Sequence, residues 1–196
     1  MLKLKKSQKN KKFKVIIFYG IQAVGKFTVA KKLHEQTGYK FFHNHHTHDL
    51  ARQLFERGNK HADVLMENLR FFLFKEVGKA KINAITTHTF SSDYVSLTGL
   101  RDPLYMKKIE SIIEKEGGKA CFVHLIPSRE AILKRVQNSS RSQYMKLRNK
   151  KLMKEILNTK DWKTNAPVAN NLTIDNTKLS PKKVSDMIIK YLKLKP

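Results

Sequence analysis

The sequence predicts an α/β domain in which a mostly parallel β-sheet is covered by helices on both faces. Short β-branched and aromatic runs alternate with amphipathic helical segments along the chain, as parallel sheets require. The 196 residues suit one domain, and no Pro- or Gly-rich linker divides them. A glycine-rich turn between the first strand and the first helix also favours this class.

Three strands and three helices are expected in the first half of the chain. The strands are the apolar runs Lys14–Gly20, Tyr39–His43 and Ile82–Phe90. The helices are predicted at 28–37, 47–55 and 61–80, where apolar residues recur at helical spacing and Thr47 suits an N-cap. Glycines at 38 and 58 end the first two helices.

Two strands and four helices are expected in the second half. The strands are the apolar run Ala120–Ile126 and the shorter Leu172–Asp175. The helices are predicted at 104–116, 128–136, 150–157 and from Ser180 onward, where Ser180 suits the N-cap and Pro181 the first helical position. The polar stretch 138–147 is expected to be irregular.

The cysteine content and the hydropathy of the chain indicate in which cellular compartment the protein works. The one cysteine, Cys121, lies in an apolar run, so we expect a buried, inert thiol in a chain that works in the reducing cytoplasm. No apolar run approaches the ~20 residues that span a bilayer, so no membrane partner is expected. Residues 1–12 are lysine-rich and predict a flexible basic tail, which leaves 13–196 as the domain.

The chain is strongly basic, with 40 Lys and Arg against 16 Asp and Glu and a formal net charge of +24. Such a charge invites a nucleic-acid partner, because cations that neutralise phosphates release counterions. Lysine greatly outnumbers arginine, however, and the lysines are scattered over every predicted helix without an aromatic stripe. A diffuse basic surface is therefore favoured over a nucleic-acid-binding face.

The glycine-rich turn matches the phosphate-binding motif G-x-x-x-x-G-K as Gly20-Ile21-Gln22-Ala23-Val24-Gly25-Lys26. Glycines let several backbone N–H groups point at one phosphate, the following helix adds its positive end, and Lys26 bridges the outer phosphates. We expect a nucleotide to contact Gly20, Gln22, Ala23, Val24, Gly25, Lys26, Phe27 and Thr28. This segment is called the phosphate loop below.

The motif departs from its usual form directly after the lysine. The usual Ser or Thr binds magnesium through its hydroxyl, but here Phe27 stands in that place and Thr28 follows. Thr28 and Asp93 are the candidate metal-facing residues, and Mg²⁺ would otherwise be held through water and phosphate oxygens. Asp93 follows two serines, so a turn or a helix cap is an equal alternative for it.

With these residues the sequence resembles P-loop kinases related to adenylate kinase, and more closely the shikimate-kinase-like or AAA-family ATPase group. The shared segments are A-V-G-K-x-T at 23–28, F-H-N-H at 42–45, S-R-x-x-x-x-K-L at 140–147 and D-N-T-x-L-S-P at 175–181. The resemblance covers nearly the whole chain after the tail. It implies the P-loop nucleoside triphosphate hydrolase fold, a three-layer sandwich around a five-stranded parallel sheet, with a small lid at about 138–149.

The resemblance also implies roles for cations and for the last loop. Lid arginines in such kinases clamp the phosphates, and by their place in the chain Arg135 and Arg141 match that role, with Lys146 and Arg148 as further candidates. Arg141 is favoured and Arg148 is not. The loop that begins at Asn176 would lie against the adenine.

The segment His43-Asn44-His45-His46-Thr47-His48-Asp49 is unusual, and three interpretations of it stay open. A transition-metal site would use two or three imidazoles. An acceptor pocket would use Asn44 and His45 to bind, with Asp49 or a histidine as the base. A polar loop would simply cap the next helix. Arg101 is a further candidate for an anionic acceptor, or it pairs with Asp102 in a local turn.

Taken together, the sequence predicts an ATP-dependent phosphotransferase that uses Mg²⁺ and transfers the γ-phosphate to a small-molecule acceptor. Lys26, Arg135, Arg141 and Asp49 are the expected catalytic residues. The alternative is a nucleotide-binding protein or slow ATPase with a regulatory or nucleic-acid-associated role.

Overall fold

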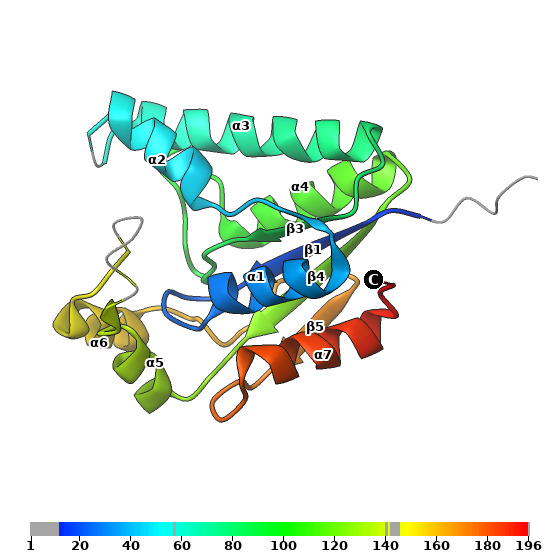
Figure 1. The fold of residues 1–196 in the computed structure, drawn as a ribbon. Coiled ribbons are helices and arrows are strands. Elements are labelled where there is room, and N and C mark those ends of the chain that lie inside the picture. The colour runs from blue at the N-terminus through cyan, green and yellow to red at the C-terminus, as the bar shows by residue number, and fades with distance from the viewer. Residues whose placement is uncertain (1–11, 57, 140, 142–145, 196) are drawn as a thin grey trace, which may run out of the picture.

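The computed structural model describes residues 12–56, 58–139, 141 and 146–195 (Figure 1). The predicted basic tail, apart from its last residue, lies outside this range, and the predicted lid is described only in part. Within the described part, no helix is long and apolar enough to cross a membrane.

Five strands form one parallel sheet, as the sequence and its resemblance predicted. They are β1 (Lys14–Tyr19), β2 (Lys40–Phe41), β3 (Ala84–Thr87), β4 (Lys119–Leu125) and β5 (Asn171–Ile174). Their order across the sheet is β2-β3-β1-β4-β5, and every neighbouring pair is parallel. β1 therefore lies at the centre, and its carboxyl end is where the chain changes its direction of travel across the sheet.

Helices cover both faces of the sheet, which gives the expected three layers (Figure 1). One face packs against α1 (Lys26–Thr37), α5 (Arg129–Arg135), α6 (Lys150–Thr159) and α7 (Pro181–Leu192). The other packs against α3 (Lys60–Lys79) and α4 (Asp102–Lys115). α2 (His45–Leu54) follows β2 and contacts α3.

The two halves of the core follow from the alternation of side chains along β1. Ile16 and Phe18 are fully buried in the cluster that contains α1 and α7. Val15, Ile17 and Tyr19 point to the opposite face, with the apolar side of α4. Cys121 is buried as expected, and burial raises the pKa of its thiol.

Two local predictions around α2 were wrong. The second strand ends at Phe41 and not at His43, since as an edge strand it pairs with β3 over two residues only. The helix then begins at His45, so the N-cap is Asn44 and not Thr47. Thr47 is inside the first turn, where its hydroxyl donates to the Asn44 carbonyl at 3.1 Å.

A core substitution tests the packing of α1 against the sheet. Leu33 is fully buried, whereas Leu54 on α2 is 64% exposed. We expect Leu33→Ala to lower the free energy of unfolding by about 2–5 kcal/mol, because lost burial and a cavity add together. Leu54→Ala should stay within about 0.5 kcal/mol of the parent. Chemical denaturation measures both, and equal losses would contradict this packing.

Candidate functional site

The phosphate loop joins the central strand β1 directly to α1. Its backbone has positive φ at Gly20 (129°), Ala23 (63°) and Gly25 (100°). Gly20 is also crowded, since a Cβ there would lie 3.0 Å from the Leu125 carbonyl oxygen and 3.3 Å from the His124 ring. Glycine is therefore required at position 20 both for its backbone angle and for its close contact with the end of β4.

The ammonium of Lys26 is folded back onto this loop. Its Nζ donates to the carbonyl oxygens of Gly20 at 2.6 Å and Ile21 at 2.7 Å. Burial and, to a smaller extent, the nearby charge of Arg141 together lower the pKa of Lys26 to about 7. An anion beside Lys26 would relieve both effects, because it favours the charged form.

Two side chains from distant parts of the chain hold the loop from the β5 side. Asn176 is buried, and its Nδ2 donates to the Val24 carbonyl at 2.9 Å. Arg135, from α5, donates to Val24 O at 3.3 Å and to Asn176 O at 2.7 Å. Burial lowers the pKa of Arg135, and Asp175 opposes that shift. Both residues thus act on the loop backbone.

Phe27, which replaces the usual hydroxyl residue, has an aromatic and cationic environment. Its ring lies 5.1 Å from the ring of His43 and 5.6 Å from that of Phe41. The Nζ of Lys146 lies 4.4 Å above the Phe27 ring, within the range of a cation–π contact. Phe27 therefore links α1 both to the end of β2 and to Lys146, which lies in the predicted lid.

Arg141 belongs to the same cationic group. Its Nε donates to the Leu147 carbonyl at 2.9 Å, and burial lowers the pKa of its guanidinium. Its charge also lowers the pKa of both Lys26 and Lys146. The structure therefore brings Arg141 and Lys146 near Lys26, whereas Arg148 is exposed.

On the other side of Lys26, the start of α2 is tied to β3 and α3. The Thr87 hydroxyl donates to Asn44 Oδ1 at 3.0 Å. Arg70, from α3, donates to Thr47 Oγ1 at 2.8 Å and to the Asn44 carbonyl at 3.2 Å. Arg70 does not stand out in the sequence, because nothing in the helical pattern of α3 marks it as a residue that hydrogen-bonds to the start of α2.

The histidines of the unusual segment cluster around the start of α2. The His43 ring lies 5.8 Å from that of His45 and 4.0 Å from that of His46. Burial lowers the pKa of His43 and His48 to about 4 and that of His45 to about 3, with Lys146 and Arg70 among the cations that contribute. These three imidazoles are therefore neutral near pH 7.

A metal site has no support in the arrangement of this cluster. Among the described residues, no group of three or more His, Cys, Asp or Glu side chains is placed to hold a metal ion. His45 also lies on a helix and not on the extended chain that would put it on one face with His43.

The positions of Asp49 and Arg101 give little support for a role in acceptor binding. Asp49 is half-buried on α2, one helical turn after His45, and its carboxylate makes no hydrogen bond or ion pair with a described residue. Arg101 is the exposed N-cap residue of α4. The local pair with Asp102 is not found in the described part, since the Asp102 carboxylate faces His88 and the Ser91 N–H instead.

The structure does not bring the two candidate metal-facing residues, Thr28 and Asp93, together. The Asp93 carboxylate accepts from the Ser91 hydroxyl and, at 3.2 Å, from the Asp161 N–H, and it lies 3.8 Å from Lys160 Nζ. Thr28 is exposed on α1. The contacts of Asp93 agree with the turn alternative, so these residues do not fit a magnesium ion that the protein ligates directly.

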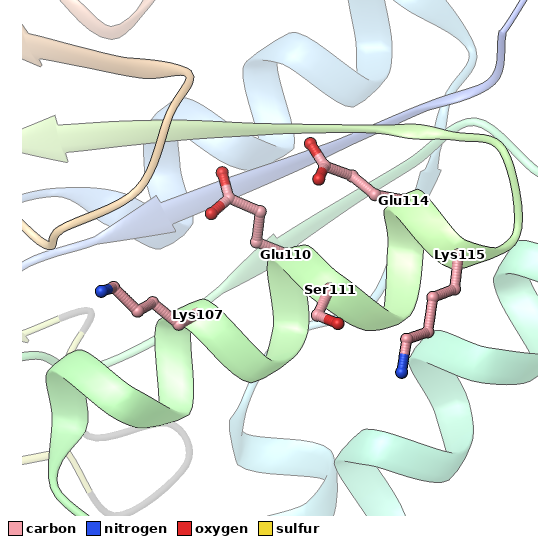
Figure 2. A pocket seen from close by; sticks show the side chains of 5 residues that line it. All are labelled: Lys107, Glu110, Ser111, Glu114 and Lys115. Carbon is pink, nitrogen blue, oxygen red and sulfur yellow. The ribbon is translucent and has the colours of Figure 1, made fainter.

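A shallow hollow lies away from this site, on the exposed side of α4. Figure 2 shows that its lining side chains all come from that helix and spread along it without converging. They are Lys107, Glu110, Ser111, Glu114 and Lys115. Both signs of charge alternate there, so the hollow carries no argument for a ligand.

The fold is shared with solved kinase structures. A sugar kinase from a Janibacter species has a TM-score of 0.66 and 16% identity, over 95% of this chain and 97% of that one. A shikimate kinase from Bacteroides thetaiotaomicron has a TM-score of 0.60 and 14% identity, over 93% and 99%. A tunicamycin resistance protein from Deinococcus radiodurans has a TM-score of 0.59 and 16% identity, over 93% and 97%.

These likenesses extend over nearly the full length of each chain, and they show that this protein has the fold of the shikimate-kinase-like P-loop kinases. No protein-family model and no curated protein matches the sequence.

The depressed pKa of Lys26 predicts a pH-dependent stability difference between the parent and Lys26→Met. A lysine with a lowered folded pKa destabilises the fold below that pKa, and the penalty disappears as pH rises to its unfolded value of 10.5. We therefore expect the free energy of unfolding of the parent, relative to Lys26→Met, to rise between pH 7 and 10.5.

The size of this change is bounded by ~1.4 kcal/mol for each pKa unit. Urea unfolding of both proteins across that range measures it. The comparison with Lys26→Met cancels the titration of all other groups. A difference that stays constant with pH would contradict the depressed pKa.

Proposed function

We propose that the protein is an ATP-dependent phosphotransferase that transfers the γ-phosphate to a small-molecule acceptor. The observation that carries this proposal is the half-buried side chain of Lys26, whose ammonium is held inside a positive-φ loop at the start of α1 with Arg141 close by. Such a group is poorly solvated and lacks a described carboxylate partner, so it favours an anion. The kinase fold agrees with a nucleotide as that anion.

The phosphates would replace the carbonyl contacts of Lys26. In this proposal the loop N–H groups and the N-terminus of α1 hold the inner phosphates, and Lys26 turns to the β- and γ-phosphates. Arg141 and Lys146 approach from the other side and neutralise charge on the transferred group. Arg135 supports the loop through Val24 and is a positioning residue here.

The base of the nucleotide fits beside Asn176. The Oδ1 of this buried side chain has no hydrogen-bond partner, while its Nδ2 is already engaged with Val24. An unpaired buried acceptor is costly, and the amino group of adenine is a donor that would satisfy it. This supports the expected adenine contact of the loop that begins at Asn176.

Magnesium would enter with ATP as part of the substrate. Phosphate oxygens and water can complete its coordination, because Mg²⁺ often keeps several waters. Phe27 contributes no ligand in this proposal, and Thr28 and Asp93 remain candidates for indirect contacts only.

The acceptor would lie between the phosphate loop and α2. Asn44, His45 and Asp49 offer hydrogen-bonding groups at the carboxyl edge of β2 and β3, and Arg101 lies at the start of α4 for an anionic substituent. Shikimate and simple hexoses are the first acceptors to screen, because the structural neighbours include shikimate kinases and a sugar kinase.

Calorimetric titration with Mg-ATP tests the nucleotide site. Lys26→Ala should lose at least about tenfold in affinity, or about 1.4 kcal/mol, because it removes the cation that contacts the outer phosphates. Lys31→Ala is the matched control, since Lys31 is exposed on the same helix.

Unchanged affinity in Lys26→Ala would sink the proposal. If ATP is hydrolysed but none of the screened acceptors is phosphorylated, the result favours the slow ATPase alternative. Salt-sensitive RNA binding would then favour a nucleic-acid-associated role.

Binding should also take up protons. Because the pKa of Lys26 is about 7 before binding and an adjacent phosphate raises it, the complex holds more protons than its parts above pH 7. The affinity for Mg-ATP should therefore fall from pH 7 to 9. Titrations at pH 8 in buffers of different ionisation enthalpy measure the uptake, and Lys26→Met should abolish it.

A further inference from the structure

A histidine and an aspartate form a buried pair at the carboxyl end of β3. His88 Nε2 lies 3.5 Å from Asp102 Oδ1, and the other oxygen of Asp102 accepts the Ser91 N–H at 3.0 Å. His88 is only 8% exposed and Asp102 only 7%. The His88 ring also stacks on the Tyr105 ring, with centroids 4.5 Å apart and planes 12° apart.

The backbone places this pair beside the phosphate loop. The His88 N–H donates to the Phe18 carbonyl at 2.8 Å, and two residues later the Phe90 N–H donates to the Gly20 carbonyl at 3.2 Å. The same Gly20 carbonyl accepts from Lys26. His88 therefore comes directly after β3, the neighbour of β1, and lies where β1 ends and the phosphate loop begins.

The charges around His88 come from both sides of the site. Asp102 of α4 raises its pKa, whereas burial, Arg70 of α3 and Lys26 of α1 lower it, and burial is the largest effect. His88 in turn affects the pKa of His48 on α2. The ring is thus close enough to both the phosphate loop and α2 to feel their charges, and burial holds its pKa below the usual 6.5.

We propose that His88 is the catalytic base that takes the proton of the acceptor hydroxyl, and that Asp102 is its positioning residue. The proposal rests on the phosphotransferase function above. With Nε2–H directed at Asp102, Nδ1 carries the free lone pair, and Nδ1 makes no hydrogen bond to any residue in the described part.

The step balances as follows. The acceptor oxygen forms a bond to the γ-phosphorus, and its proton passes to Nδ1 of His88. The bond between the γ-phosphorus and the β–γ bridging oxygen breaks, and ADP leaves with that electron pair. Asp102 stabilises the imidazolium that results, as a carboxylate beside a histidine does in hydrolytic triads.

Asp49 is less suited to this role. The Asp49 carboxylate makes no hydrogen bond or ion pair with a described residue, whereas His88 has a buried carboxylate 3.5 Å from its Nε2. The pair was not singled out from sequence because residues 88 and 102 are 14 positions apart, and only the fold brings the start of α4 to the segment that follows β3.

ATP hydrolysis tests the proposal, with water in the acceptor position as the probe. We expect His88→Gln to lower the rate about 10²-fold at pH 7.5, with the affinity for Mg-ATP unchanged. His61→Gln, an exposed histidine on α3, is the matched control and should equal the parent.

The pH profile separates catalysis from a merely structural role. The rate of the parent should fall as pH drops through a step below 6.5, because protonation of His88 removes the base. This step should be absent in His88→Gln. In Asp102→Asn it should move to lower pH, because the carboxylate that raises the pKa is gone.

The protonated nitrogen of His88 can be measured by imidazole ¹⁵N spectra of the parent protein, so this test does not depend on whether a variant folds. They should show His88 protonated on Nε2 above pH 7. Protonation on Nδ1 instead, or a parent-like rate and pH profile in His88→Gln, would overturn the assignment and leave the proposed function intact. Failure of the parent to bind Mg-ATP would overturn both.

Discussion

The turn from β1 into α1 is the constraint on which the rest of the site depends. Gly20 leaves the central strand at a φ of 129°, pressed against the end of β4, and the chain enters α1 within six residues. This tight turn leaves carbonyls such as that of Val24 pointing outward. Asn176 and Arg135 satisfy that carbonyl, so α5 and the loop after β5 are bound to the same turn.

The turn also gathers positive charge on half-buried side chains. Lys26, Arg135 and Arg141 belong to none of the ion pairs found among the described residues, and burial lowers the pKa of each. A site like this stabilises the folded chain less than an apolar contact would. In the proposed function it is arranged in advance for an anion, and the +24 charge of the chain would raise the local concentration of such ligands.

The other side of the site has a different chemistry. Burial keeps His43, His45 and His48 neutral near pH 7, so this side offers hydrogen-bonding groups. His88 differs from them because a buried carboxylate faces it. In the proposed reaction the two sides therefore have different roles. The cations of one side neutralise phosphate charge, and a neutral imidazole of the other side accepts the proton.

The sequence by itself determined the class of fold and the phosphate loop, because strand–helix alternation and the glycine spacing are local properties of the chain. The five parallel strands confirm the class of fold. The glycine-rich turn does lie between β1 and α1, and phosphate binding by that turn stays a prediction. Local pattern failed at α2, where the edge strand is short and the N-cap is Asn44 instead of Thr47. Only the tertiary structure decided the partners of Lys26, the contact of Lys146 with Phe27 and the pairing of His88 with Asp102. Each of these joins residues through sheet order and helix packing, and no periodicity along the chain records them.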